Sequence, residues 1–418
     1  MDSSFNTRIP YDVLVAVIDE LASQRYTAEL RACSQTCRML VHPCYTHLFS
    51  TISIHQNASQ FAALLHRNPK IQHYVRNLSY YPEDTSEAIA NAFLMLDNVE
   101  TLFMANRYNS YRIREWSSLP LHIQHALLHL CNSPSVTNIR MERFINLPSI
   151  LLSNCSNLKH LHVVCPTGFT FQVCDTMRPP PKLLSLDVSL YETMPIELEW
   201  IYERQTNGLP TLDLSILESL SFPVFRSWKE GYLPVERILR SSPKLKNLCC
   251  TCKYNHNYWH ALHNILILIP VDEYGQHSLH DLSQVLVIAL PTLRSLTLEW
   301  CKFGVPGYFG PVVEFLAALS SQPNCLNKIC ISMIVSQSSY LVDQDWEKLD
   351  KVLADRQSGF RHMEHLKIEL WIVPLVDEDM TLVVQGQMAE IKATRLPQLS
   401  SAANDYLDFK VSVNWRLI

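Results

Sequence analysis

The chain has 418 residues and is 47% hydrophobic, which is enough for a large core and more than one structural unit. Lys and Arg number 35 against 40 Asp and Glu, so the formal charge of −5 gives no electrostatic reason to expect nucleic acid or an anionic membrane as the main partner. Glycine occurs at only 9 positions, and neither glycine-rich motif that cradles phosphate is present.

The expected compartment follows from the N-terminus and the cysteines. Residues 1–8 are polar and lack the apolar core of a signal peptide. No apolar run approaches the roughly 18 residues that a membrane-spanning helix needs. Thirteen cysteines without a signal peptide favour reduced, mostly buried thiols. We therefore expect an intracellular protein, cytoplasmic or nuclear, with no membrane partner.

Three short helices are predicted between Pro10 and Phe49. Pro10 suits a first helical position, and Asp12 places negative charge in the first turn. Thr27 is the predicted cap of the second helix, and Pro43 the predicted opening of the third. The first helix has an apolar face with the i, i+3, i+4, i+7 spacing, formed by Leu14, Val17, Ile18 and Leu21.

A unit of about 40 residues encloses little core, so its apolar faces must be buried on a partner or on the following chain. Its motif reads Ile9-Pro10-x-x-Val13-Leu14, then Leu30-Arg31-Ala32-Cys33-Ser34-x-x-Cys37-Arg38. It resembles an F-box in the version common at the N-termini of fungal F-box proteins. The chain has Ile9 where the family usually has Leu, and Leu40 where the family usually has Trp.

The resemblance implies an F-box at residues 1–50 that docks on the Skp adaptor of a Skp–cullin–F-box ubiquitin ligase. Carried over position by position, it implies these adaptor-binding residues: Pro10, Val13, Leu14, Val17, Ile18, Leu21, Leu30, Cys33, Cys37, Arg38 and Leu40. The loss of the Trp removes a large apolar anchor from that surface. The alternative from the residues alone is an ordinary amphipathic helical cap on the domain behind.

One pattern, apolar-x-x-apolar-x-apolar, recurs along the rest of the chain. The last two apolar positions of each copy have period-2 spacing, which places them on one face of a short strand. A helical pattern precedes many copies, and this alternation is typical of a solenoid with parallel strands. The copies begin at Phe49, Val75, Val99, Val136, Leu158, Leu183, Leu217, Leu245, Leu293, Leu326 and Met363.

The pattern resembles the leucine-rich repeat family, in the irregular form that often follows a fungal F-box. Only Leu293-x-x-Leu296-x-Leu298-x-x-Cys301 completes that family's longer motif. The predicted fold class is therefore α/β, with a three-helix F-box followed by an irregular leucine-rich-repeat-like solenoid of alternating helices and short parallel strands. A compact α/β domain with coincidental leucine patterns is the alternative.

The repeat domain is predicted to span residues 51–418 and to recognise a target, with a C-terminal cap over about 370–418. Within the cap we predict a helix at 377–392, a loop at 396–404 and a last strand at 409–415. The strand would close the open end of the sheet.

The Cys/His-rich segment 249–263 offers two interpretations. Three histidines share a helical spacing that can ligate zinc, whereas Leu248, Cys250 and Cys252 fit the inward face of a repeat strand. We predict core cysteines and a loop, with no metal and no cofactor. Aromatic residues in this loop are the predicted target contacts: Tyr254, Tyr258 and Trp259. The candidate metal ligands are Cys249, Cys250, Cys252, His256, His260 and His263.

Catalysis has little support in the sequence. The carboxylates Asp343, Asp345, Glu347 and Asp350 are predicted to lie in the opening turns of an exposed helix, where they complement the helix dipole. The expected function is a substrate-recruiting subunit of a ubiquitin ligase, without an active site, that binds the adaptor, through it the cullin, and an unknown target. Two rivals remain: a repeat scaffold whose degenerate F-box serves no ubiquitin ligase, and an enzyme built on the repeats.

Overall fold

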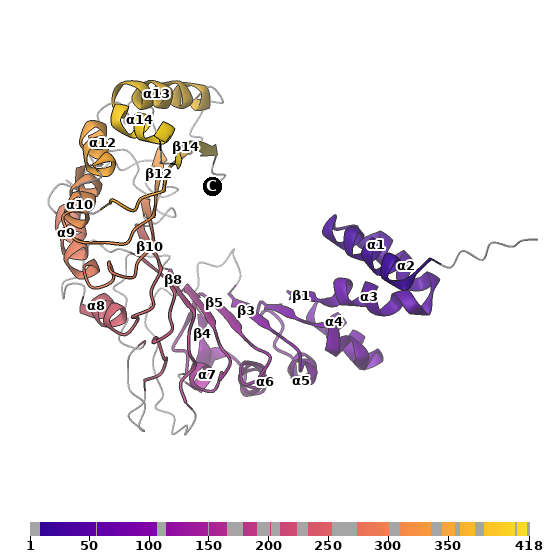
Figure 1. The fold of residues 1–418 in the computed structure, drawn as a ribbon. Helices are drawn as coiled ribbons and strands as arrows, with labels where there is room; N and C mark the ends of the chain where they lie inside the picture. Colours follow the sequence, from indigo (N-terminus) through magenta and orange to yellow (C-terminus); the bar gives the residue numbers. More distant parts are fainter. Residues whose placement is uncertain are drawn as a thin grey trace, which may run out of the picture. The chain divides into compact units, whose positions relative to one another are not determined.

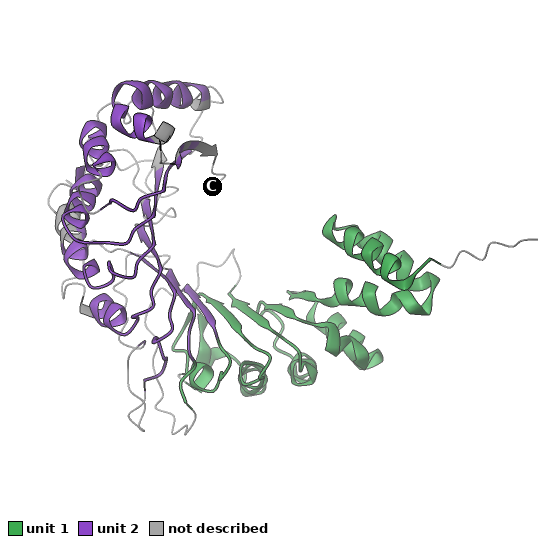
Figure 2. Cartoon of the chain, viewed as in Figure 1, with its two compact units in different colours: residues 1–158, 172–181 green, residues 159–171, 182–418 purple. Residues whose placement is uncertain are grey.

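The computed structural model describes residues 9–55, 57–106, 114–148, 150–164, 179–189, 201, 210–223, 233–252, 274–300, 310–335, 345–355, 360–372, 380–405 and 408–415. The chain divides into two compact units, shown in Figure 2. Unit 1 comprises residues 1–158 and 172–181, and unit 2 comprises residues 159–171 and 182–418.

Unit 1 begins with three helices and continues with short strands and helices (Figure 1). The first helices are α1 (Tyr11–Ser23), α2 (Thr27–Thr36) and α3 (Arg38–Phe49). The strands are β1 (Thr51–Ile54), β2 (Asn77–Tyr80), β3 (Thr101–Ala105), β4 (Arg114–Glu115), β5 (Asn138–Glu142) and β6 (Phe144–Ile145). The remaining helices are α4 (Ala58–Arg67), η1 (Pro69–Tyr74), α5 (Glu87–Met95), η2 (Trp116–Ser118), α6 (Leu121–Cys131) and α7 (Ile150–Ser153).

Unit 2 repeats the same alternation. Its strands are β7 (His160–Val164), β8 (Ser185–Ser189), β9 (Ser219–Pro223), β10 (Asn247–Cys252), β11 (Ser295–Trp300), β12 (Lys328–Val335), β13 (His365–Ile372) and β14 (Asp408–Trp415). Its helices are α8 (Leu233–Arg240), α9 (Tyr274–Leu286), α10 (Gly310–Ser320), α12 (Trp346–Ala354), α13 (Met380–Thr394) and α14 (Pro397–Asp405).

Apart from β4 and β6, which form a separate two-stranded parallel sheet, the strands of each unit pair in chain order and run parallel. The order is β1-β2-β3-β5 in unit 1 and β7 through β14 in unit 2. The register aligns equivalent motif positions, as in Leu220, Leu248 and Leu296 on three successive strands. Parallel strands joined through helices and stacked in sequence order make a solenoid-like α/β fold, so the predicted fold class is confirmed.

The recurring motif supplies the core between each sheet and its helices. The three apolar positions are buried in every copy from Val75 to Met363. The first copy differs, because Phe49 and Ile52 are only half-buried while Ile54 is buried. In each unit the described helices that connect the strands lie along one side of the sheet (Figure 1), which leaves the alternate strand positions on the opposite face.

A repeated backbone contact fixes the start of most strands in the two units. One carbonyl accepts hydrogen bonds from two consecutive N–H groups of the next repeat. Arg76 O accepts them from Glu100 and Thr101, and Lys246 O from Arg294 and Ser295. The contact satisfies backbone groups at the strand ends and sets the register of the leucine ladder.

Three predictions about local structure are wrong, and two are confirmed. The loop predicted at 396–404 is wrong, because α14 occupies it. Pro43 does not open the third helix; α3 begins at Arg38, where the extended backbone of Cys37 ends α2, and Pro43 lies inside α3 and is buried. Thr27 is not the cap of α2, as predicted, but its first residue; the N-cap position is Tyr26, and no side-chain cap hydrogen bond is made there. The helix predicted at 377–392 and the strand at 409–415 are present as α13 and β14.

The predicted domain boundary after residue 50 coincides with the junction of α3 and β1. The division into compact units groups the three helices with the first repeats, so the boundary stays a prediction.

Candidate functional site

The three N-terminal helices share a very small core. One residue from each helix is buried in it: Ile18 from α1, Leu30 from α2 and Cys44 from α3. Partly buried side chains pack around them, namely Leu21, Ala22, Cys33, Leu40 and Leu48. Burial of so little apolar surface contributes only a few kcal/mol, about 1.5–3 per fully buried large side chain.

The outer surface of α1 carries apolar side chains that face solvent. Val13 and Val17, four residues apart, lie on one face of the helix and are 47% and 52% exposed. Ile9, just before the helix, is 61% exposed, and Tyr11 adds to the same end. We call Ile9, Val13 and Val17, which are spaced four residues apart, the α1 apolar face; Tyr11 lies on another side of the helix. No Lys or Arg occurs in α1.

The structure divides the eleven predicted adaptor-binding residues by exposure. Exposed are Pro10, Val13, Val17, Cys37 and Arg38; half-buried are Leu14, Leu21, Cys33 and Leu40; buried are Ile18 and Leu30. Five of the eleven belong to the core of the three helices or pack against it, namely Ile18, Leu21, Leu30, Cys33 and Leu40. Leu40, at the position of the family's Trp, packs against the core of the unit. Exposed large apolar residues that the motif does not assign to the adaptor surface are Ile9, Tyr11, Tyr26 and Met39.

An aromatic cluster fixes α3 to the first repeat. The rings of Tyr45 and Phe49 meet edge to face at 5.0 Å, and Tyr45 meets Tyr74 of η1 at 5.9 Å. The Tyr74 hydroxyl lies 3.1 Å from His42 Nδ1. Edge-to-face aromatic pairs add about 0.5–1.5 kcal/mol beyond their buried area. The three-helix unit is thus held to the repeats through α3, and α1 remains on the outside.

The predicted target-binding residues Tyr254, Tyr258 and Trp259 lie outside the described residues, as do the three candidate histidine ligands. Within the segment that is described, Cys250 is buried and Cys249 lies partly exposed on the opposite face of β10. This agrees with the strand interpretation of these cysteines. Among the described residues, no group of three His, Cys, Asp or Glu side chains is placed to hold a metal ion.

The prediction that the acidic residues Asp343, Asp345, Glu347 and Asp350 lie on an exposed surface is wrong for Asp350. Asp350 does not sit on an exposed surface; it is buried, and its carboxylate accepts hydrogen bonds from the backbone N–H groups of Gln398 and Leu399. Glu347 is exposed on the same helix, and Asp345 pairs with Lys348 at 3.1 Å. Asp343 lies outside the described residues. Asp345 and Asp350 therefore have separate structural roles.

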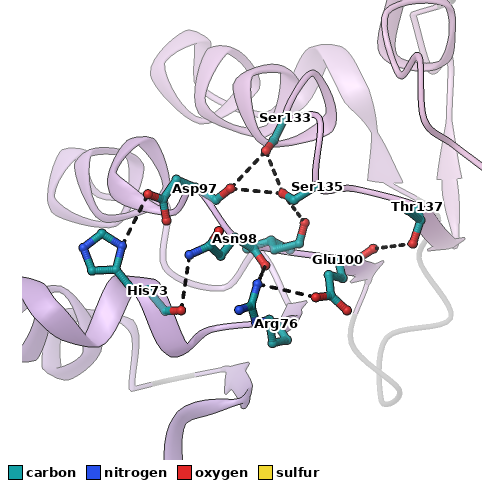
Figure 3. A network of polar contacts seen from close by, with 9 residues as sticks. His73, Arg76, Asp97, Asn98, Glu100, Ser133, Ser135 and Thr137 are labelled. Carbon is teal, nitrogen blue, oxygen red and sulfur yellow. Dashed lines mark hydrogen bonds and ion pairs between the residues drawn. The ribbon is translucent and has the colours of Figure 1, made fainter. Parts of the chain in front are cut away.

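A network of polar contacts joins the turns that precede β2, β3 and β5 in unit 1 (Figure 3). Ser135 donates to the carbonyls of Asp97 and Val99, at 3.1 and 2.8 Å. Arg76 pairs with Glu100 at 3.4 Å. Most of these bonds end on backbone carbonyls of the neighbouring repeat, so the network fastens successive repeats together.

In unit 2, His162 and Asp187 resemble two members of a hydrolytic triad. His162 Nδ1 lies 2.5 Å from Asp187 Oδ2, but the Ser189 hydroxyl donates to Asp187 and not to His162. A triad requires the serine on the other imidazole nitrogen, and His162 Nε2 is buried without a hydrogen-bond partner. The pair is therefore a contact between β7 and β8. Burial acts to raise the pKa of Asp187, but bonds from His162, Ser221 and Ser189 outweigh it and hold that pKa below its ordinary value.

Comparison with known proteins adds no family to these observations. No protein-family model matches the chain, and no curated protein matches it. Each described helix is too short or too polar to cross a lipid bilayer.

Proposed function

We propose that the chain is a substrate-recruiting subunit of a Skp–cullin–F-box ubiquitin ligase. In this proposal α1 to α3 hold the Skp adaptor, the repeats hold a target protein, and the chain has no active site of its own. It raises the effective concentration of the target near a ubiquitin-charged enzyme. Such a subunit works inside the cell, in the cytoplasm or nucleus.

The observation that carries the proposal is the α1 apolar face. A helix whose inner side is used by a three-residue core, and whose outer side still exposes Val13 and Val17, has apolar surface to bury on another protein. The order of Pro10, Val13 and Leu14, followed by Leu30, Cys33 and Cys37, matches the F-box motif. The attachment of α3 through Tyr45 and Phe49 supports a fixed connection between adaptor and repeats.

The solenoid supports the second half of the proposal. Stacked repeats present a long, mostly polar sheet face, which suits binding to a protein better than binding to a small molecule. The target itself is identified by neither the motif nor the fold.

The direct test is binding of the full-length chain to a purified Skp-type adaptor. We expect wild-type chain to form a stable complex and the double variant Val13→Asp, Val17→Asp to lose at least about tenfold in affinity, because each apolar contact at an interface centre contributes about 1–2 kcal/mol. Asp is tolerated in the first turn of a helix, so Val13→Asp should leave α1 folded. Circular dichroism of the variant checks this.

Leu382→Asp is the matched control, because Leu382 is an exposed leucine on α13, in unit 2. It should bind the adaptor as wild type does. Leu21→Asp is a poor probe, since Leu21 packs against the core of the three helices and its replacement would unfold them. Unchanged binding by the Val13, Val17 variant would refute the assigned face.

The rival function is a repeat scaffold with a degenerate F-box that engages no ubiquitin ligase. The inward position of Leu40 favours this rival, because the side chain at the family's Trp position packs against the core of the three helices and not on their outer surface. A wild-type chain that is folded by circular dichroism but does not bind the adaptor would establish this rival over the main proposal.

A further inference from the structure

Four side chains, two directly after β1 and β2 and two on β3 and β5, form a continuous line of contacts in unit 1. We call His55, Tyr81, Phe103 and Arg140 the aromatic strip. The rings of His55 and Tyr81 stack at 3.9 Å with an interplanar angle of 15°. Tyr81 meets Phe103 edge to face at 5.8 Å, and the Arg140 guanidinium lies 5.1 Å from the Phe103 ring centre.

The strip lies on the face of the sheet that is opposite to the core. Phe103 and Arg140 are register partners on β3 and β5. Their chain neighbours Leu102, Met104 and Ile139 are fully buried. Side chains alternate along a strand, so Phe103 and Arg140 point away from the core. His55 and Arg140, at the two ends of the strip, are exposed, and the two central rings are half-buried.

The strip exposes a guanidinium to solvent, while the carboxylate that it pairs with is covered. Arg140 donates from Nε and Nη2 to one oxygen of Glu142, whose side chain is only 5% exposed, while that of Arg140 is 51% exposed. The carboxylate is thus covered and the guanidinium faces outward. The two bonds use Nε and Nη2, and within the described part of the chain no acceptor lies on Nη1, which can donate to an anionic group.

The shape of the strip selects the kind of ligand. It crosses three strand spacings, about 14 Å, which equals about four residues of an extended peptide. A small molecule needs a concave pocket that buries most of its surface, whereas Tyr, Phe and Arg on an open face are typical of protein interface centres. Planar rings and a guanidinium pack well against an aromatic side chain of the ligand. The exposed guanidinium can also bond an acidic side chain of the ligand.

We propose that the aromatic strip binds an extended segment of the target in which an aromatic residue lies close to an Asp or Glu. The aromatic side chain packs on Tyr81 and Phe103, and the carboxylate accepts hydrogen bonds from Arg140 Nη1. The inference rests on the proposed target-binding role of the repeats and assigns it a place and a ligand chemistry.

The test is a selection of phage-displayed random dodecapeptides on immobilised full-length chain. We expect enrichment of peptides that combine an aromatic residue with Asp or Glu within about four positions. A synthetic peptide of the enriched sequence should then bind in solution, as measured by fluorescence anisotropy. Its amide analogue, with Asn or Gln in place of each acid, should bind at least about tenfold more weakly, since an ion pair to Arg is the charge-assisted contact.

Two variants locate the binding. Phe103→Thr removes the central ring with a residue that suits a strand, and should lower the peptide affinity at least about tenfold. Arg140→Met combined with Glu142→Gln removes the charge without leaving a buried carboxylate unpaired, and should abolish the preference for the acid. Tyr26→Thr, an exposed aromatic residue outside the strip, is the matched control.

Enriched peptides without an acid–aromatic combination, no enrichment at all, or equal binding by the Phe103→Thr variant would each overturn the inference. Adaptor binding separates this result from the proposed function. The Phe103→Thr variant should bind the adaptor normally, and the Val13→Asp, Val17→Asp variant should bind the peptide normally. A chain that binds the peptide but not the adaptor would refute the proposed function and leave the inference about the aromatic strip standing.

Discussion

The carboxylate of Asp350, on α12, accepts a 2.8 Å hydrogen bond from the backbone N–H of Leu399, at the start of α14. Its second oxygen accepts from Gln398 at 3.0 Å. The first N–H groups of a helix have no partner within the helix, and Leu396, which directly precedes α14, has no side-chain oxygen that could cap it. A residue 49 positions earlier thus supplies the cap.

Asp350→Ala should therefore destabilise the C-terminal end of unit 2. We expect a loss of about 1–3 kcal/mol, the cost of a lost cap together with buried N–H groups left unsatisfied. Hydrogen exchange at the amides of Gln398 and Leu399 measures the effect locally. Glu347→Ala, on the exposed side of the same helix, should change protection by less than about 0.5 kcal/mol. Equal protection of α14 in both variants would contradict the capping role.

The stability of the N-terminal helices should depend on Ile18. It is one of three residues in their buried cluster, and its truncation to Ala costs about 2–4 kcal/mol. We expect Ile18→Ala to abolish amide protection in α1 to α3 while β2 and β3 remain protected. Val17→Ala removes an exposed side chain next to it and should leave protection unchanged. Protection of α1 that survives Ile18→Ala would show that the helices are held mainly by the repeats.

The contact between His162 and Asp187 should make unit 2 sensitive to acid. The pKa of Asp187 is lower in the folded chain than its ordinary value of about 3.9. Its contribution to stability is therefore complete above about pH 4 and is lost as the pH falls through the lowered folded-state value. The side chain of Asp187 is 38% exposed, so we expect a contribution of no more than about 1 kcal/mol.

Asp187→Asn tests this dependence. The difference in unfolding free energy between wild type and variant should be present at pH 7 and shrink toward pH 2, in urea denaturation followed by fluorescence. A difference that stays constant over this range would show that packing, and not charge, accounts for the effect of the substitution.

The cysteines should differ in reactivity. Burial, with a smaller contribution from the nearby Glu369 carboxylate, raises the pKa of the Cys330 thiol to about 11. Because the thiolate is the nucleophile, Cys330 should react with iodoacetamide at least about tenfold more slowly than exposed Cys37 at pH 7.5. The Cys330 rate should still be rising at pH 10. Peptide mapping by mass spectrometry gives both rates in one experiment, and equal rates would contradict the expectation.

The sequence by itself determined the alternation of helices and strands and the residues of the core. The apolar-x-x-apolar-x-apolar pattern is local, and burial on one face of a strand is a property of period-2 spacing, so copies such as Leu217, Leu220 and Phe222 could be assigned without knowing their neighbours. The first helix could also be predicted from the sequence, because Pro10 and the regularly spaced apolar residues are local signals within about four turns.

Only the tertiary structure decided which apolar residues remain outside. Val17 and Ile18 are adjacent and equally apolar in sequence, yet Ile18 is buried by Leu30 and Cys44 while Val17 faces solvent, because the packing angle of three helices selects a narrower face than the pattern shows. The aromatic strip and the cap on α14 also depend on the tertiary structure. Phe103 and Arg140, or Asp350 and Leu399, are far apart along the chain, and their contact depends on strand register and helix stacking, which no local pattern encodes.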